Sequence, residues 1–275
     1  MLRDGVNDRI KERLDKLKSH KAKNYFLSNI TYPSSEQAKD KYLIGQSMKF
    51  VGDVIPEIIK LTKELKKYYK DIWDQNEITA SYFLIGKATK SLEGAISEAK
   101  KGNVSNVVEM CRSGQEAMDL VFLFMDSEGK NFLEKWFRGE IVGNAESRRI
   151  IDKATNEMLK GLLNKQISVE DLKKDIYWVY SLFTHSGYGS MLDMLDVFHE
   201  DFDFDNISGF HYTNRYVHLV NNLTVQILLG FKNIFIIKRD TVNLQKTEEL
   251  LALFGDQFAG PKEMAESLSK YEKVK

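Results

Sequence analysis

Long seams of mostly apolar residues, with almost no helix breakers, constrain the fold of this chain more than any other feature. Between about residues 36 and 74 such residues recur in alternating steps of four and three: Ile44, Met48, Val51, Ile55, Ile58, Thr62, Leu65, Tyr69 and Ile72. The segments 78–101, 104–126 and 213–237 show the same spacing. This spacing aligns one stripe along each helix and is typical of helices that pack in a bundle. Only 3 of the 275 residues are proline, so the stripes run nearly uninterrupted.

Two residues inside these helices predict local departures from a regular seam. Pro56 has no backbone N–H, so the first helix should kink near Gly52. Gly230 lies on the seam of 213–237 and predicts the close approach of a neighbouring backbone. Shorter helices are predicted at 130–138, 144–164, 190–198, 241–254 and 261–271, whereas the alternating segment HEDFDFDN predicts an edge strand or an extended loop.

The pattern predicts an all-α fold, an antiparallel helical bundle of about eight helices with an N-terminal helical extension. Residues 1–33 form a charged N-terminal segment, and residues 34–275 form a single helical domain. Within that domain, 102–240 is the central core and 241–275 supplies C-terminal helices. A separate helical hairpin at 36–101 is the alternative for the first two long helices.

Composition excludes several classes of protein. The 40 basic and 40 acidic residues give a formal net charge of zero, which excludes a uniformly basic surface for nucleic acid. Residues 1–23 carry eight basic residues against four acidic ones, which indicates either a solvated helix or a basic arm for RNA or an acidic partner. The start lacks an apolar signal segment and the single cysteine, Cys111, allows no intramolecular disulfide, so we expect a cytoplasmic protein.

The most apolar stretch, residues 219–237, is interpreted as a buried helix. Its length approaches that of a membrane span, but it carries five polar residues that are costly in lipid. These residues are Asn221, Asn222, Gln226, Lys232 and Asn233. We therefore expect no membrane association.

The segment from Ser168 to Met194 carries most of the candidate functional side chains. Tyr177, Ser181 and His185 are spaced four residues apart, so they align along one stripe of a helix. His185 falls in the last turn, where the helix macrodipole favours its charged form, and Tyr188 follows between two glycines. His185 is interpreted either as an acid–base group or anion contact, or as a structural cap of its helix.

A second polar group interrupts the seam of 104–126. Arg112 and Glu116 are one turn apart and can pair on their own helix, and Gln115 occupies a seam position. If this helix faces the one that ends at His185, the two groups meet in a buried polar cluster. Such a cluster is either a structural network that fixes helix register or a site where arginine holds a phosphate while histidine moves a proton.

The remaining signals are more limited. Arg215 and His218 lie near the start of a predicted helix, where an anion can bind, with a solvated helix end as the alternative. The acidic cluster at 199–205 lacks the later glycine and glutamate that an EF-hand requires. Cys111 lies on a seam and is interpreted as a core residue and not as a nucleophile. No zinc-ligand spacing, Walker loop or dinucleotide fingerprint is present, so we expect no metal and no cofactor.

Three segments carry a resemblance to a known family, in the order CRSGQEAMDLVFLF, NFLEKWFRG and YWVYSLFTHSGYG. Over roughly residues 80–237 the chain resembles a group of uncharacterised bacterial helical proteins distantly related to the HEPN superfamily. An arginine-x-x-x-glutamate helix is present as Arg112/Glu116, and a serine-x-x-x-histidine helix as Ser181/His185. The resemblance implies a HEPN-like core, frequent dimerisation, and a role in toxin–antitoxin or phage defence as a metal-independent ribonuclease.

The chain departs from the HEPN nuclease motif, in which histidine follows arginine by four to six residues. Trp178, Val179 and Tyr180 precede His185 in place of an arginine, and Arg215 and His218 are only three apart, so Arg112 would have to substitute in space. We therefore expect a HEPN-like interaction module of prokaryotic defence or stress, forming a homodimer, with RNA or protein as further partners. The alternative is a ribonuclease with Arg112, Glu116, Ser181 and His185 in catalytic roles and Gln115, Tyr177, Tyr188, Arg215 and His218 in binding roles.

Overall fold

A computed structural model describes residues 37–142 and 217–258, except residues 70, 72 and 102, together with 149–153, 156, 169–184, 195–196 and 201–202. Near the N-terminus it describes residues 8, 11, 12, 15, 16, 20 and 21. The fold is all-α, as the seams predict. The described residues add to the helices only a two-residue ladder, in which β1 (Leu195–Asp196) pairs antiparallel with β2 (Asp201–Phe202).

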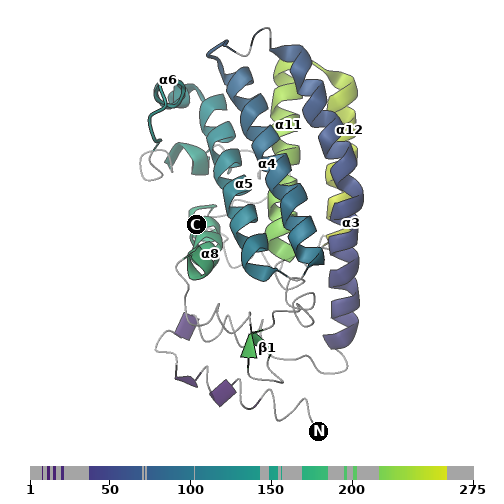
Figure 1. The fold of residues 1–275 in the computed structure, drawn as a ribbon. Helices are drawn as coiled ribbons and strands as arrows, with labels where there is room; N and C mark the ends of the chain where they lie inside the picture. The colour runs from purple at the N-terminus through teal and green to yellow at the C-terminus, as the bar shows by residue number, and fades with distance from the viewer. Residues whose placement is uncertain are drawn as a thin grey trace, which may run out of the picture.

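Five long helices form a bundle of two layers (Figure 1). α3 (Gln37–Glu64), α4 (Glu77–Lys100) and α5 (Val104–Met125) are successive antiparallel neighbours in one layer. Behind them, α11 (Val217–Lys238) and α12 (Thr241–Phe258) form an antiparallel pair. α11 contacts each of the other four long helices and is therefore the centre of the bundle.

Shorter elements complete the described part of the fold. The 3-10 turn η1 (Leu65–Tyr68) extends α3, and the 3-10 turn η2 (Ser127–Gly129) leads from α5 into α6 (Lys130–Phe137). α8 (Val169–Thr184) packs against α5 on the side away from α3 (Figure 1). This packing brings the two helices with the candidate polar residues together.

Local sequence explains where α4 begins and how it is joined to α5. The side chain of Asn76 accepts hydrogen bonds from the backbone N–H groups of Ile78 and Thr79, both at 3.0 Å, and so caps the helix. At the other end, Lys101, Asn106 and Asn103 donate to the carboxylate of Glu98 and lower its pKa to about 2. Because Asn103 and Asn106 belong to the start of α5, Glu98 ties the two helices at their connection.

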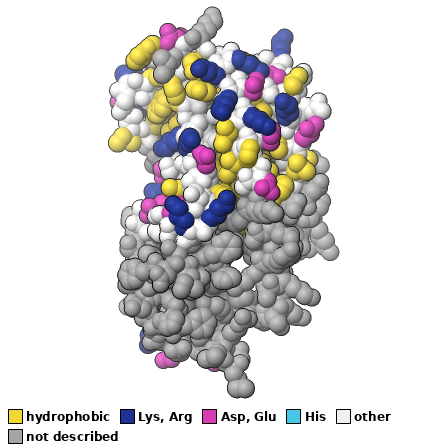
Figure 2. Space-filling model, turned by 45° about the vertical axis from the view of Figure 1, so that its right-hand side comes forward, with side chains coloured by type: hydrophobic (Ala, Val, Ile, Leu, Met, Phe, Trp, Pro, Cys, Tyr) yellow, Lys and Arg dark blue, Asp and Glu magenta, His cyan; other side chains and the backbone are white. Residues whose placement is uncertain are grey.

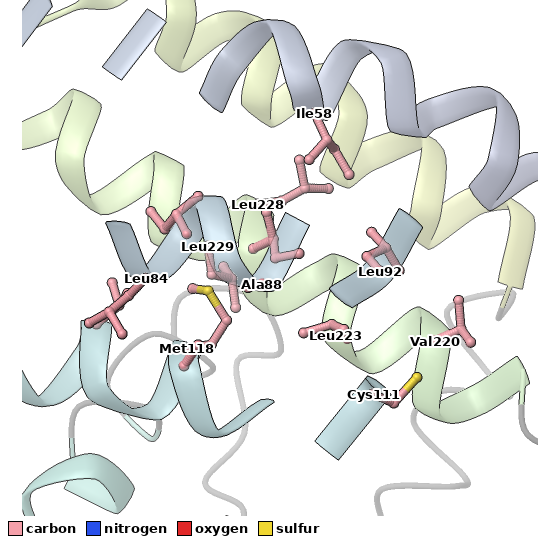
Figure 3. Packing of buried hydrophobic residues seen from close by; sticks show 14 of the residues in the cluster. Ile58, Leu84, Ala88, Leu92, Cys111, Met118, Val220, Leu223, Leu228 and Leu229 are labelled. Carbon is pink, nitrogen blue, oxygen red and sulfur yellow. The ribbon is translucent and has the colours of Figure 1, made fainter. Parts of the chain in front are cut away.

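The predicted seams meet in one continuous core. Six of the seven seam positions on α4 are buried, and the seventh, Tyr82, is half-buried. Figure 3 shows Ala88 and Leu92 of α4 among side chains of α5 and α11, which include Met118 and Leu223. Thus the four-three spacing correctly predicted the packed face of this helix.

The structure differs from the predictions at several positions. α3 ends at Glu64, before the predicted end near 74, and continues only as the turn η1. The helix predicted at 190–198 is wrong at Leu195–Asp196, because these residues pair with Asp201–Phe202, where the predicted strand is present. Ile237 is 55% exposed, since the last turn of α11 emerges from the bundle. The predicted helices at 144–164 and 261–271 lie largely or wholly outside the described residues.

Gly230 has a close neighbour, but it is a side chain and not the predicted backbone. A Cβ at this position would lie 2.7 Å from Cε of Met118 on α5 and 3.4 Å from Cδ1 of Ile85 on α4. The absence of a side chain therefore leaves room for methionine to fill the centre of the bundle.

α11 is long and apolar enough to cross a membrane by length and composition alone. However, 61% of its most apolar window is buried inside the bundle. Its apolar surface is therefore used for packing against the other long helices, which is the arrangement predicted for residues 219–237.

Candidate functional site

A network of five polar side chains links α5, α8 and α11 inside the bundle. Gln115 donates through Nε2 to Asp119 Oδ1 at 3.1 Å and to Gln226 Oε1 at 2.5 Å. Its own Oε1 accepts a hydrogen bond from Asn222 Nδ2 at 2.9 Å. Asp119 Oδ2 accepts a hydrogen bond from the Tyr177 hydroxyl at 2.8 Å. We call these five residues the inner network.

Close packing of α5 on α11 makes the inner network possible. Gly114 precedes Gln115, and a Cβ on Gly114 would lie 2.6 Å from Cδ2 of Leu223. The two helices therefore approach closely at this level, which lets Gln115 reach two residues of α11, one turn apart. Gln115 is only 2% exposed, and its amide uses both hydrogens and its oxygen within the protein.

A second, more exposed set of contacts lies one turn away and includes Arg112. Its Nε donates to Glu116 Oε1 at 2.9 Å, and its Nη1 donates to Thr184 Oγ1 at 2.6 Å. The side chains of Arg112 and Glu116 are 31% and 38% exposed. Thr184 also donates to the carbonyl oxygen of Tyr180 at 3.0 Å. We call Arg112, Glu116 and Thr184 the outer set.

Two further hydroxyl groups on α8 differ in their hydrogen bonding: that of Ser181, a predicted site residue, and that of its neighbour Tyr180. Ser181 donates to the carbonyl oxygen of Tyr177 on its own helix at 2.8 Å, so its hydroxyl is directed to the backbone and not to Arg112. Tyr180 is fully buried, and its hydroxyl has no hydrogen-bond partner within the part of the chain that the structure describes. Neither residue joins the inner network.

Burial controls the acid–base properties of the groups at this site. Desolvation, followed by the nearby Asp119 carboxylate, raises the pKa of Tyr177 far above its ordinary range. Desolvation is also the main cause that raises the pKa of Tyr180. Both phenols therefore stay protonated at neutral pH, so Tyr177 acts as a donor and not as a base.

Cys111 precedes Arg112 on α5 but faces the core. Its side chain is fully buried, and burial raises the pKa of the thiol to about 12. A thiol with this pKa is not a nucleophile at neutral pH. The structure thus agrees with the prediction that Cys111 is a core residue.

The structure describes only some of the candidate residues. His185, Tyr188 and Arg215 lie outside the described residues, so the predicted meeting of Arg112 and His185 is not described. His218 is exposed in the first turn of α11. Lys21 places its Nζ 4.8 Å from the ring centroid of Trp178, so this residue lies against α8.

Four residues of the two sets were not singled out as candidates from the sequence: Asp119, Asn222, Gln226 and Thr184. Asp119 lies one turn after Gln115, the spacing at which two side chains can pair on one helix. Asn222 and Gln226 are one turn apart in the most apolar stretch, and two amides at that spacing are a detectable sign of a shared buried partner. Thr184 carries no comparable signal, because a threonine at the end of a helix is common.

The chemistry that the described residues allow is limited. Among them, no group of three or more His, Cys, Asp or Glu side chains is arranged to hold a metal ion. Within the described residues, the inner network matches its donors to acceptors across three helices. Only the outer set offers a partly exposed cationic group, the guanidinium of Arg112.

A scan against protein-family models found no match for the chain, and searches of curated proteins and of solved structures found none either. The relation to HEPN proteins accordingly stays a prediction from the three sequence segments.

Proposed function

We propose that the protein is a non-catalytic helical interaction module. The inner network and the outer set then serve to hold α8 on α5, and α5 on α11. HEPN-like ancestry and a role in prokaryotic defence or stress form part of the proposal, supported by the resemblance of the three sequence segments.

The engagement of the candidate polar groups with one another is the observation that carries this proposal. Gln115, Asp119 and Tyr177 pair within a buried network, and the guanidinium of Arg112 is shared between Glu116 and Thr184. A site built to bind a substrate keeps some polar groups directed to the space that the substrate fills. These groups instead have partners on neighbouring helices, as expected of a network that fixes helix register.

A metal-independent ribonuclease is the second candidate, and one contact favours it. Nη1 of Arg112 reaches Thr184, the residue directly before His185 in the sequence. The guanidinium is partly exposed and retains further donor hydrogens for a phosphate. In this alternative Arg112 binds a phosphate and His185 transfers a proton.

Incubation of the purified protein with single-stranded RNA separates the two functions. Arg112→Lys keeps the positive charge but loses the planar donor arrangement, and His185→Ala removes the imidazole. Arg138→Ala is the matched control, because Arg138 is an exposed arginine that also pairs with a glutamate, at 2.6 Å. We expect no cleavage by any of the four proteins. Cleavage by the wild type and by Arg138→Ala, but not by the two site variants, would overturn the proposal.

Thermal unfolding of an Arg112→Ala variant tests the structural role of the outer set. Loss of the Arg112 side chain removes a partly exposed ion pair and a hydrogen bond between helices. We therefore expect a decrease of about 1 kcal/mol in the free energy of unfolding. Arg138→Ala should change it by less than about 0.5 kcal/mol, as is usual for an exposed surface residue.

A further inference from the structure

A hollow between α4 and α5 is separate from both the inner network and the outer set. Its volume is about 420 Å³, which falls within the range of roughly 300–1,000 Å³ that is usual for small-ligand sites. Its lining includes Lys87, Lys90 and Ser91 of α4 and Glu109, Met110 and Ser113 of α5. We call this hollow the α4–α5 groove.

Close approach of the two helices brings a methionine into the lining of the groove. A Cβ on Gly94 of α4 would lie 2.6 Å from Sδ of Met110 on α5. The absence of a side chain at Gly94 therefore leaves room for Met110, which is partly buried. Its flexible thioether provides an apolar part of the lining that can adapt to an apolar side chain of a ligand.

The antiparallel register of the two helices orders the lining residues along the groove. Three pairs of neighbouring residues fix this register: Gly94 with Met110, Ser91 with Gly114, and Glu98 with Asn106. Lys87 and Lys90 therefore lie at one end of the groove and Glu109 lies toward the other, with Ser113 between them. At a rise of 1.5 Å per residue, the two charged ends are about 8–13 Å apart along the helix axes.

Each end of the groove carries a charge that has no ion-pair partner in the described part of the chain. Lys87 is exposed on α4 and Glu109 is exposed on α5, and neither side chain forms an ion pair there. Lys90, by contrast, pairs with Glu93 on its own helix at 3.1 Å. One positive and one negative charge therefore remain, at opposite ends of the groove.

This separation of charge selects a ligand that carries both signs. A purely anionic ligand would be repelled by Glu109 at one end of the groove. Figure 2 shows carboxylates among the lysine and arginine side chains on the described part of the face that it draws, so a polyanion such as RNA meets acidic groups there as well. A zwitterion instead finds an opposite charge at each end.

The span of the groove and its polar groups narrow the zwitterion to a short peptide. Three extended residues span about 10 Å, which matches the separation of the two charged ends. Ser91 and Ser113 line the groove between these ends, and a serine hydroxyl both donates and accepts hydrogen bonds. The groove thus offers hydrogen bonds to peptide groups and an apolar contact, Met110, to a side chain.

We propose that the α4–α5 groove binds a short peptide, of about three residues, with free amino and carboxyl ends. The carboxylate of the peptide pairs with Lys87, its ammonium group pairs with Glu109, and an apolar side chain packs on Met110. This site goes beyond the proposed function, because it lies outside the contacts that hold α8 and takes a small ligand.

An NMR titration of the isotope-labelled full chain with alanyl-leucyl-alanine tests the proposal. The tripeptide with free ends is compared with its N-acetyl form, which lacks the positive charge, and with its C-terminal amide, which lacks the negative charge. We expect the free tripeptide to shift the backbone amide signals of Ser91 and Ser113. Its dissociation constant should be lower than that of either blocked form by about fivefold, as for the loss of one partly exposed ion pair.

Two charge variants assign the two ends of the peptide. Glu109→Gln should weaken binding of the free tripeptide by about fivefold but leave the N-acetyl form unaffected, because that form has no ammonium group to pair. Lys87→Gln should likewise weaken the free tripeptide and leave the C-terminal amide unaffected. Glu77→Gln and Lys130→Gln are matched controls, since both residues are exposed, lie outside the groove and form no ion pair with the rest of the described chain.

Three results would overturn the proposal. The first is the absence of shifts at every soluble concentration of the tripeptide. The second is equal binding of the free and the blocked forms. The third is inorganic phosphate that shifts the same amide signals as strongly as the tripeptide, which would identify a general anion site. None of these results alters the RNA-cleavage comparison of the Arg112 and His185 variants, so this site and the proposed function are tested separately.

Discussion

At the scale of single residues, Tyr177 and Tyr180 differ in whether their hydroxyl groups have a hydrogen-bond partner. The two rings lie almost one turn apart on α8 and pack edge-on with centroids 5.7 Å apart. Tyr177 donates to Asp119, whereas the hydroxyl of Tyr180 has no partner among the described residues. Removing the first hydroxyl leaves a buried acceptor with one donor fewer, but removing the second relieves an uncompensated desolvation cost.

We therefore expect opposite effects from the same chemical change at the two positions. Tyr177→Phe should lower the free energy of unfolding by about 1–3 kcal/mol, the usual cost of leaving a buried polar group unsatisfied. Tyr180→Phe should leave it unchanged or raise it by up to about 1 kcal/mol, because an unpaired hydroxyl is removed from the core. Urea unfolding followed by circular dichroism measures both values, and equal losses would contradict the assignment of partners.

Cys111 provides a second prediction at this scale. Because the thiol is fully buried and its pKa is raised to about 12, Ellman's reagent at pH 8 should not label the native protein. Labelling should become complete after unfolding in urea. Rapid labelling of the native chain would show that α5 opens at this position.

The polar residues of α5 illustrate what sequence alone predicts about a site. Gln115 stands out because it interrupts an apolar seam, and this observation correctly indicated a polar contact between helices. The choice of partner did not follow, because Asp119, Asn222 and Ser181 were all within reach of some packing of the helices. The rotation of α8 about its own axis decides whether Ser181 or Tyr177 reaches this cluster, and the spacing of the seam defines that rotation only to within about one residue.

At the scale of the elements, the turn between α11 and α12 is formed by two adjacent residues with different roles. Arg239 ends α11 with φ of 55°, a left-handed conformation, and its N–H donates to the carbonyl oxygen of Ile236 at 3.1 Å. Asp240 caps α12 by accepting the N–H of Asn243 at 3.1 Å. Burial opposes the charged form of Asp240, but hydrogen bonds from Tyr68, Lys67 and Asn243 outweigh it, so its pKa lies below the ordinary 3.8.

The variant Asp240→Asn removes the negative charge at residue 240 but keeps a side chain that can cap α12. Asparagine caps a helix nearly as well as aspartate, so the variant keeps the bond to Asn243 but loses the charged partner of Lys67. Because the folded-state pKa of Asp240 is lowered, its charge stabilises the native state above the unfolded value of 3.8. We expect the variant to be about 1 kcal/mol less stable at pH 7, allowing for partial exposure of the Lys67 pair.

The difference between wild type and Asp240→Asn should shrink as the pH falls below 3.8. Urea unfolding of both proteins at pH 7, 4 and 2.5 measures this. A difference that stays constant over this range would show that the charge of Asp240 contributes nothing and that the cap alone matters.

At the scale of the whole molecule, α11 determines how the helices share one core. It contacts α3, α4, α5 and α12, so its buried face meets side chains from both halves of the chain. The sequence predicted an all-α bundle because the four-three spacing is a local property of each helix. The spacing did not predict which helix is central, because all four long seams have the same spacing. What distinguishes α11 is that apolar residues cover a wider part of its circumference.

The central position of α11 bears on whether residues 37–101 act as a separate hairpin. Ile58 of α3 and Ile85 of α4 are both buried in the cluster that includes Leu228 of α11, so the hairpin alone would expose a face that α11 covers. We therefore expect the described helices to unfold in one transition, with coincident thermal curves from far-ultraviolet circular dichroism and tryptophan fluorescence. Tryptophan fluorescence reports on helices other than α3 and α4, since Trp136 lies on α6 and Trp178 on α8.

A fragment of residues 37–101 should show little cooperative unfolding, because two helices without their partner bury too little apolar surface. A fragment that unfolds cooperatively at the temperature of the full chain would instead identify 37–101 as a domain of its own.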